Sequence, residues 1–297
     1  MELKEPLNFD KQINRLKEHK LRIDDPDYAK SILKEINYYR FTGYALEFRK
    51  NKCDSNKCDS NFIDNTNFNM IYDIYRFDED LRLLLLEYLL KIEIYYRTQI
   101  SYGFSLNKCK NSPHDQHYDI NNYYNKTSIK KIWSSIEREI GYNKDSDVVK
   151  HHNTNYGKKM PLWVLVELIS FSNLSKYYNS LYTWDQKIIA NLVGFNNNNL
   201  SNWLHCMSVL RNMCAHNNRL YNKTFRPATK LTKGFLRFNP DIKNDSLFAY
   251  IITLSRLLPN KPLKKDFKVS FINLINSYKE KVNFEKIGLV DNYIKLL

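Results

Sequence analysis

The sequence predicts an all-α protein, and three observations carry this prediction. Apolar residues recur at helical spacings of three and four along most of the 297-residue chain. Gly and Pro number only 7 and 8, and no linker rich in Pro, Gly or Ser divides the chain. Hydrophobic residues make up 43% of the sequence, enough to bury a large core. We therefore expect one helical domain over residues 1–297, with polar loop insertions near 51–65, 106–126 and 142–160.

Two helices are predicted in the N-terminal third. The spacing of Tyr28, Ile32, Ile36 and Tyr39 predicts a helix over 28–49. The longest helix is expected at about 66–104, and its apolar stripe consists of Leu81, Leu85, Tyr88, Leu89, Ile92, Tyr96 and Ile100. The acidic run Asp78, Glu79 and Asp80 is typical of a helix start or a joint.

The longest predicted helix also contains Glu93 and Arg97, which are four residues apart. An ordinary surface ion pair explains this spacing. The alternative is that the two side chains orient another functional group or contact RNA.

Polar segments and two further helices follow. Residues 106–126 are predicted to form a surface loop, and a helix capped by Thr127 or Ser128 ends at Gly141. Residues 142–159 are polar and include His151 and His152, for which solvent exposure is favoured over RNA contact or metal binding.

A helix over 161–182 should begin with Pro161 in its first turn. Glu167 is its only acid, and among apolar neighbours it should need a partner such as Arg40, Arg97 or Arg211.

The segment 201–222 contains the most informative residues of the chain. Its apolar stripe is formed by Trp203, Met207, Leu210 and Cys214. On an ideal helix Arg211 and His216 would lie about 140° apart, so they converge only if the helix ends or kinks between them. Asn217 and Asn218 favour a helix exit at 215–218.

Arg211 and His216 have two interpretations. A guanidinium and an imidazole that share one anion indicate phosphate chemistry, because Arg binds phosphate oxygens and His moves a proton near neutral pH. The alternative is that both are capping or surface groups. After this segment, helices are expected near 245–258 and 264–281, and a small helical cap over 284–297.

Composition favours a polyanionic partner. The formal net charge is +14, from 46 Lys and Arg against 32 Asp and Glu. The N-terminal residues lack a basic start followed by an apolar core, and no apolar run reaches membrane-spanning length. We expect a soluble, cytoplasmic protein without a membrane association.

Five Cys residues are present, and reduced, structural roles are expected for Cys206 and Cys214. Cys53 and Cys58 belong to a tandem repeat, NKCDS followed by NKCDS, which favours a polar loop expanded by duplication over a zinc site. We expect neither a metal site nor a cofactor.

Four segments resemble a known family. The first is Ile36-Asn37-Tyr38-Tyr39-Arg40 with Gly43-Tyr44, and the second is residues 77–98, which end in Ile92-Glu93 and Arg97-Thr98. The third is Pro161-Leu162-Trp163 with Glu167 and residues 170–175. The fourth is residues 211–216, Arg-Asn-Met-Cys-Ala-His. Together they resemble bacterial abortive-infection (Abi) proteins of the AbiD/AbiF type, and the fourth resembles the R-x4-6-H motif of HEPN-superfamily ribonucleases. Ser172 departs from the family, which often has Gly there.

The resemblance implies a HEPN-like helical bundle and a metal-independent endoribonuclease that acts in phage defence. It implies catalytic roles for Arg211 and His216 and products with 2′,3′-cyclic phosphate and 5′-hydroxyl ends. The supporting residues would be Asn212, Glu93, Arg97 and Glu167, and the RNA-binding residues Arg40, Arg219, Asn222 and Lys223. It also implies a homodimer and a cognate small non-coding RNA that restrains or guides the enzyme, in addition to cellular target RNA.

Two other functions remain open at this point. The first is a non-catalytic RNA-binding module of a toxin-antitoxin system, in which Arg211 and His216 only hold a partner RNA. The second is a structural helical scaffold.

Overall fold

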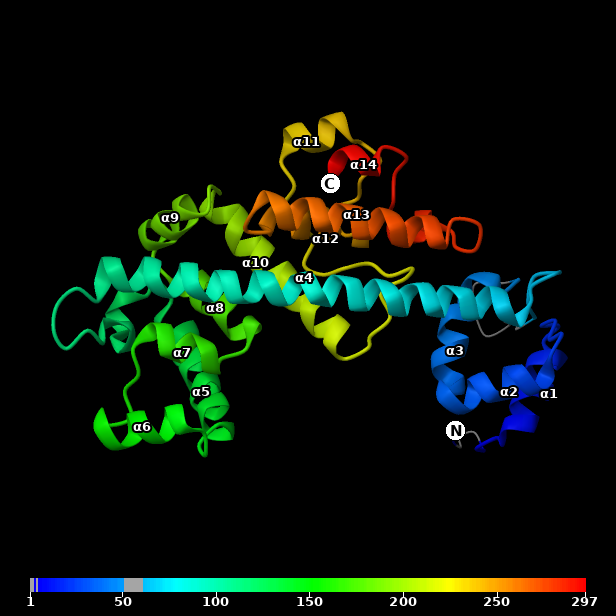
Figure 1. Ribbon diagram of the computed structural model, residues 1–297, viewed down its shortest axis with the longest axis horizontal. Helices are drawn as coiled ribbons and strands as arrows, with labels where there is room; N and C mark the ends of the chain where they lie inside the picture. The colour runs from blue at the N-terminus through cyan, green and yellow to red at the C-terminus, as the bar shows by residue number, and fades with distance from the viewer. Residues whose placement is uncertain (1–2, 4, 51–60) are drawn as a thin grey trace. The chain divides into compact units, whose positions relative to one another are not determined.

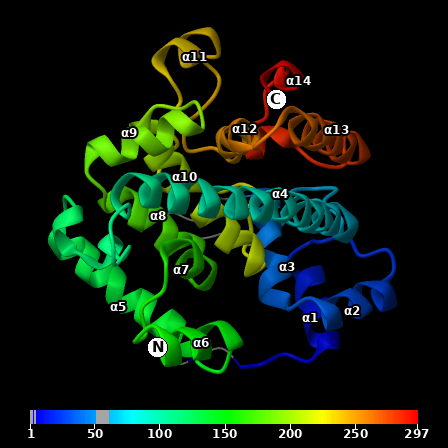
Figure 2. The same ribbon diagram turned by 60° about the vertical axis from the view of Figure 1, so that its left-hand side comes forward.

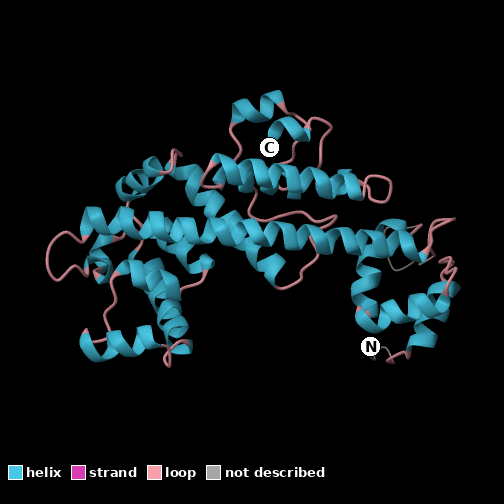
Figure 3. Ribbon diagram, viewed as in Figure 1, coloured by secondary structure: helices cyan, strands magenta, loops and turns pink. Residues whose placement is uncertain are grey.

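The computed structural model describes residue 3 and residues 5–50 and 61–297, and nearly all regular structure in this part of the chain is helical (Figure 1, Figure 3). Extended pairing among these residues is limited to three isolated bridges, such as Arg22 with Asn67. The prediction of an all-α fold is therefore confirmed. Among the described residues, no helix is long and apolar enough to span a bilayer.

The chain forms two compact units, which are described separately. The first contains Met1–Leu81 and Ile272–Phe284, and the second contains Arg82–Phe271 and Glu285–Leu297. Helices α4 (Phe68–Lys108) and α13 (Lys261–Ser277) contribute residues to both units. The single domain over 1–297 stays a prediction.

The first unit contains three short helices where the sequence predicted one over 28–49. They follow α1 (Phe9–Glu18) and are α2 (Pro26–Glu35), α3 (Tyr38–Tyr44) and the 3-10 helix η1 (Ala45–Phe48). The prediction is wrong because Ile36 is extended, with φ −115° and ψ 127°. The Asn37 side chain then caps α3 by accepting a hydrogen bond from the Tyr39 N–H at 2.8 Å. The predicted loop near 51–65 and its Cys53–Cys58 repeat lie mostly outside the described residues.

The acidic run does not mark a helix start, because α4 begins at Phe68 and continues through Asp78 without a break. All three of its carboxylates accept hydrogen bonds from tyrosines of the same unit: Tyr44 donates to the buried Asp78 at 2.7 Å, Tyr75 donates to Glu79 at 3.3 Å, and Tyr278 donates to Asp80 at 2.6 Å. Burial and the bond to Asp80 raise the pKa of Tyr278. The run is therefore explained by polar packing within the unit.

The second unit is built around the C-terminal part of α4 and around α10 (Figure 2). The predicted α4 stripe is confirmed, because all seven of its residues are buried. Helix α10 packs against α8, α9 and α12, and α5 packs against α8. The bounds of the other helices are α5 (Lys126–Tyr142), α6 (Asp147–Asn155), α7 (Leu162–Leu168), α8 (Phe171–Ser180), α9 (Thr183–Leu192), α10 (Asn197–Ala215), α11 (Lys233–Phe238), α12 (Leu247–Leu257), α14 (Tyr293–Leu296), η2 (Gln116–Tyr118), η3 (Ile120–Asn122) and η4 (Phe284–Ile287).

Two predicted polar loops contain more structure than the sequence indicated. Residues 106–126 include η2 and η3, and His117 there is fully buried with Nε2 2.9 Å from the Met160 carbonyl oxygen. Burial lowers the pKa of His117 to about 4, so the ring is neutral near pH 7. Residues 142–160 contain α6, in which His151 is exposed as predicted but His152 is buried.

The predicted helix over 161–182 is two helices, α7 and α8. Ile169 is extended, and the Ser170 hydroxyl caps α8 by accepting from the Asn173 N–H. Pro161 occupies the N-cap position of α7, directly before its first turn. This break matters because it places Ser172 at the start of α8.

The predicted cap of α5 is wrong: Asn125, not Thr127 or Ser128, caps the helix by accepting from the Ser128 N–H, and the helix continues through Gly141 to Tyr142. The predictions for the C-terminal helices agree with the structure in outline. Helices expected near 245–258 and 264–281 correspond to α12 and α13, and the 284–297 cap corresponds to η4 and α14. Cys206 and Cys214 are buried and form no disulfide among the described residues, in agreement with a reduced, structural role in the core.

Candidate functional site

The site begins with the way α10 ends. Asn217 adopts a left-handed conformation with φ 53°, and its N–H donates to the Cys214 carbonyl at 3.2 Å. The Asn218 N–H donates to the Met213 carbonyl at 2.9 Å. These two bonds form a Schellman motif, which satisfies the last carbonyls of the helix. The predicted exit at 215–218 is confirmed.

His216 is the last residue before this turn. Its N–H still donates to the Asn212 carbonyl at 3.0 Å, so α10 has no kink after Arg211. The helix ends at Ala215, and His216 is its C-cap with φ −98° and ψ 17°, so the expected helix end between Arg211 and His216 is present. His216 is exposed, while the Arg211 side chain is 30% exposed.

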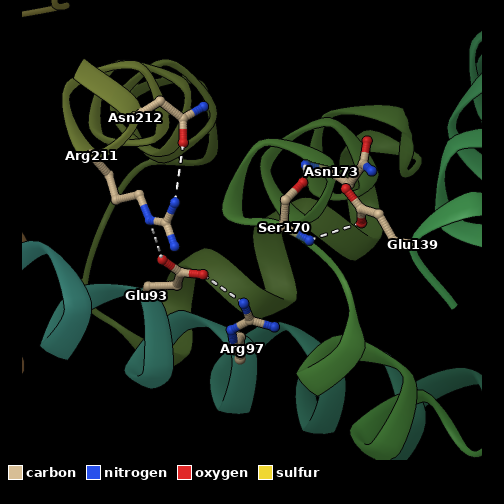
Figure 4. A network of polar contacts seen from close by, with 7 residues as sticks. All are labelled: Glu93, Arg97, Glu139, Ser170, Asn173, Arg211 and Asn212. Atoms are coloured by element: carbon tan, nitrogen blue, oxygen red, sulfur yellow. Dashed lines mark hydrogen bonds and ion pairs between the residues drawn. The ribbon is translucent and has the colours of Figure 1, made fainter. Parts of the chain in front are cut away.

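The carboxylate of Glu93 binds two arginines at once (Figure 4). Oε1 accepts from Arg97 Nη2 at 2.5 Å, one turn along α4, and Oε2 accepts from Arg211 Nε on α10 at 3.1 Å. The Glu93 and Arg97 side chains are only 6% and 10% exposed. Glu93 and Arg97 are therefore a buried pair that orients Arg211, rather than a solvated surface pair.

Asn212 extends this network to α8. Arg211 Nη1 donates to Asn212 Oδ1 at 3.4 Å, and Asn212 Nδ2 donates to Ser172 Oγ at 3.2 Å. Ser172 is a contact that sequence reasoning missed. One feature of the sequence could have indicated it: Ser172 stands where the family often has Gly. The Ser hydroxyl provides a side-chain acceptor that Gly lacks.

Arg211 retains hydrogen-bonding capacity after these contacts. A guanidinium has five N–H donors, and among the described residues only Nε and Nη1 of Arg211 have partners. Its Nη2 group is free to bind an acceptor that approaches from solvent. Two arginines against one carboxylate leave a net charge of +1, which favours an anion at this position.

Helix α5 fixes the break that positions Ser172. The Ser170 N–H donates to Glu139 Oε2 at 2.9 Å (Figure 4). Asn173 Nδ2 donates to Ser135 Oγ at 3.0 Å. Both acceptors belong to α5. The start of α8 is thus held from two sides, by α5 and by α10.

Next to Glu93 on α4, Arg97 Nη1 and the Tyr96 hydroxyl are buried polar atoms without a hydrogen-bond partner among the described residues. Burial raises the pKa of Tyr96, so this phenol stays protonated. The Arg97 guanidinium is thus held in place mainly by Glu93.

The other predicted site residues have different placements. Arg219 is half-buried, and Asn222 and Lys223 are exposed beyond the end of α10. Arg40 lies on α3 in the first unit, and its RNA-binding role stays a prediction.

The prediction that Glu167 is enclosed and paired with an arginine is wrong. Glu167 is exposed and forms no ion pair among the described residues, because Glu93 occupies the partner position of both Arg97 and Arg211.

A comparison with protein families shows to which family the chain is similar. Residues 31–222 match the family described as Abi-like protein, which is more than half of the chain. The chain belongs to the Abi-like family. No curated protein and no solved structure matches it.

Membership of the Abi-like family indicates abortive infection, a form of phage defence, as the function. The matched region contains Glu93, Ser172, Arg211 and His216, and it ends at Asn222, just after the turn that terminates α10. The site therefore belongs to the part of the chain that this Abi-like protein shares with its family.

The buried ion pair gives a stability prediction. Glu93→Ala should lower the free energy of unfolding by about 3 kcal/mol, because it leaves the buried Arg97 charge without its partner. Urea denaturation of the full chain measures this difference. The matched control is Glu87→Ala on the same helix, which breaks the exposed pair with Lys91 and should cost at most about 0.5 kcal/mol. Equal losses in the two variants would contradict a structural role for Glu93.

Proposed function

We propose that this Abi-like protein is an endoribonuclease that acts in abortive infection and uses Arg211 and His216 at the scissile phosphate. The single observation that supports the proposal is the orientation of Arg211: Glu93 and Asn212 hold its Nε and Nη1, and Nη2 remains available. The helix that positions this guanidinium ends at an exposed imidazole. The resemblance of residues 211–216 to the R-x4-6-H motif of HEPN ribonucleases supports the same assignment.

The proposed chemistry is attack of the RNA 2′-hydroxyl on the adjacent phosphorus. The bond from O2′ to phosphorus forms, the bond from phosphorus to O5′ breaks, the 2′-hydroxyl loses its proton and the 5′ oxygen gains one. His216 transfers a proton, and Arg211 stabilises the charge that develops on the phosphate oxygens. The products carry 2′,3′-cyclic phosphate and 5′-hydroxyl ends, and the reaction needs no metal ion.

Glu93, Arg97 and Asn212 are positioning residues in this proposal. Glu93 fixes the Arg211 side chain through Nε, and Arg97 neutralises part of the carboxylate's charge, which preserves the attraction of Arg211 for phosphate. Arg219, Asn222 and Lys223 follow α10 and are proposed to hold flanking phosphates.

A second function uses the same site without chemistry. The net charge of +14 supports RNA binding independently of any catalytic geometry. In that case Arg211 and His216 hold a partner RNA, and the protein is a toxin-antitoxin component that does not cleave.

Cleavage of a single-stranded RNA separates the two functions. His216→Ala and Arg211→Ala should each reduce the cleavage rate by about 10²-fold or more, while filter binding of the RNA persists. The matched control is His205→Ala, which removes another exposed histidine of α10. The rate should be unchanged in EDTA. RNA binding without cleavage by the wild type supports the non-catalytic function, and an absolute need for Mg²⁺ contradicts the mechanism.

We also propose a homodimer. One Arg and one His form a minimal site, and two copies facing each other provide two of each. Leu83, Leu90 and Ile94 support this proposal, because they lie at spacings of seven and four on α4 and are exposed although large and apolar. Ile94 directly follows Glu93, so such a surface would adjoin the site.

Mixing protomers tests the dimer. Wild-type chains mixed with an excess of His216→Ala chains should lose more activity than dilution alone predicts, because mixed dimers contain one complete motif. Ile94→Asp should shift the protein to a monomer in sedimentation velocity, whereas Lys91→Asp, on the same helix with a side chain that is 39% exposed, should do so less. Full activity of a strict monomer would refute the proposal.

The third proposed partner is a small non-coding RNA that restrains or guides the enzyme. Abundant tyrosine, 22 residues, and the basic charge suit a long contact with phosphates and stacked bases.

Protein purified from its host should therefore carry a discrete small RNA, detected by sequencing of the bound nucleic acid. The complex should dissociate steeply with increasing salt, because counterion release dominates such binding. Removal of this RNA should increase cleavage of other RNA or change its targets. Protein that purifies free of RNA and is harmless when expressed alone argues against restraint by RNA.

A further inference from the structure

A groove of about 540 Å³ lies between α6 and α7, separate from the residues of the Arg211 network. Its walls are almost entirely apolar and include Val148, Trp163 and Leu168. This volume is within the range of pockets that enclose small molecules or single side groups. Four polar residues also line it, Asp147, His151, His152 and Glu167, and they face it almost entirely with carbon atoms.

Trp163 gives the groove a flat aromatic wall. Its side chain is 42% exposed, and its indole stacks on the Tyr102 ring with centroids 6.2 Å apart and planes 13° apart. The stack holds the indole plane in a fixed orientation. An exposed, oriented indole is a surface on which a planar heterocycle stacks well.

The charges of the groove oppose those of the whole chain. Asp147 and Glu167 are exposed, and neither forms an ion pair among the described residues. In a chain of net charge +14, two unpaired carboxylates beside an apolar wall disfavour phosphate at this point. They favour a planar ligand that presents N–H donors. Trp163 and Glu167 are four residues apart on α7, so they lie on the same side of the helix.

The hydrogen bonds of α6 define what His151 offers to such a ligand. The Asn155 amide nitrogen donates to the His151 carbonyl oxygen at 3.0 Å and lies 3.1 Å from His151 Nδ1. An amide nitrogen only donates, so Nδ1 accepts and the neutral ring carries its proton on Nε2. His151 therefore presents an N–H donor, whereas Glu167 presents a carboxylate acceptor.

We propose that this groove binds a guanine base of single-stranded RNA. Guanine is the base that presents two adjacent N–H donors, N1–H and the N2 amino group, which one carboxylate accepts together; its O6 and N7 accept from a donor such as His151 Nε2. The base stacks on Trp163, and its Watson–Crick edge lies at the solvent-exposed rim of the groove, where Glu167 accepts from it. Adenine, cytosine and uracil lack the paired donors.

The inference rests on the proposed function only in assigning the base to RNA, which the Arg211 site would cleave or hold. The groove then gives that activity a base preference. Binding of the free nucleoside requires neither cleavage nor the Arg211 network, so the two proposals fail independently.

Isothermal titration of the full chain with nucleosides tests the pocket. Guanosine should bind, inosine, which lacks the N2 amino group, should bind at least about 10-fold more weakly, and adenosine more weakly still. Glu167→Gln should weaken guanosine binding by about 10-fold or more, because the amide replaces one acceptor with a donor. Trp163→Ala should weaken it similarly, whereas Trp163→Phe should retain most of it. The matched control is Glu137→Gln, an exposed carboxylate on α5, which should bind guanosine as the wild type does.

Several results would overturn the inference. They are equal affinity for guanosine and adenosine, no affinity for either, or unchanged binding in Glu167→Gln. Binding of an arginine-rich peptide that depends on Glu167, with no nucleoside binding, would assign the groove to a protein partner instead. If the protein cleaves RNA in an Arg211-dependent way but does not bind guanosine, the guanine site is refuted and the ribonuclease proposal stands. If it binds guanosine but cleaves no RNA, the guanine site stands and the ribonuclease proposal is refuted.

Discussion

The Glu93 carboxylate is the contact on which the candidate site depends. It is buried between Arg97 of its own helix and Arg211 of α10, and each of its oxygens accepts from one of them. A buried charge is costly unless it is paired and hydrogen-bonded, so this arrangement is stable only as a set of three. It fixes Arg211 through Nε, leaving Nη2 for a ligand. The same contact joins the longest helix of the chain to the helix that carries the motif.

The end of α10 and the start of α8 are organised around that contact. The Schellman turn at Asn217 terminates α10 at Ala215 with His216 as the C-cap, and Asn212 reaches from α10 to Ser172 on α8. The break before Ser170, held by Glu139, is what allows α8 to begin at this place. Local backbone chemistry thus decides where a histidine and a serine lie relative to one arginine. If residues 161–182 formed one continuous helix, the helical repeat of α7 alone would fix the direction in which the Ser172 side chain points.

The chain uses its acidic residues selectively. Several are internal partners: Asp78 accepts from Tyr44, Glu93 from two arginines, and Glu139 from the Ser170 N–H. Asp147 and Glu167 have no such role and instead line an apolar groove with an exposed tryptophan. In a protein with a large basic excess, this difference separates surfaces suited to phosphate from one suited to N–H donors.

The sequence by itself determined the helical class, the buried stripe of α4 and the exit of α10. These features are local: a spacing of three and four specifies a helix face, and Asn tolerates the left-handed conformation that ends one. The breaks at Ile36 and Ile169 could not be predicted in this way, because neither position has a Gly or Pro, and each is stabilised by an Asn or Ser cap that the following helix exploits.

The sequence also placed Glu93, Arg97, Arg211, Asn212 and His216 on the list of candidate residues, through motifs within single helices. Only the tertiary structure decided which of them meet. Glu93 and Arg211 are 118 positions apart, and their pairing depends on how α10 lies against α4. Glu167 is exposed although its neighbours in sequence are apolar, because burial depends on which face of a helix is covered and by what.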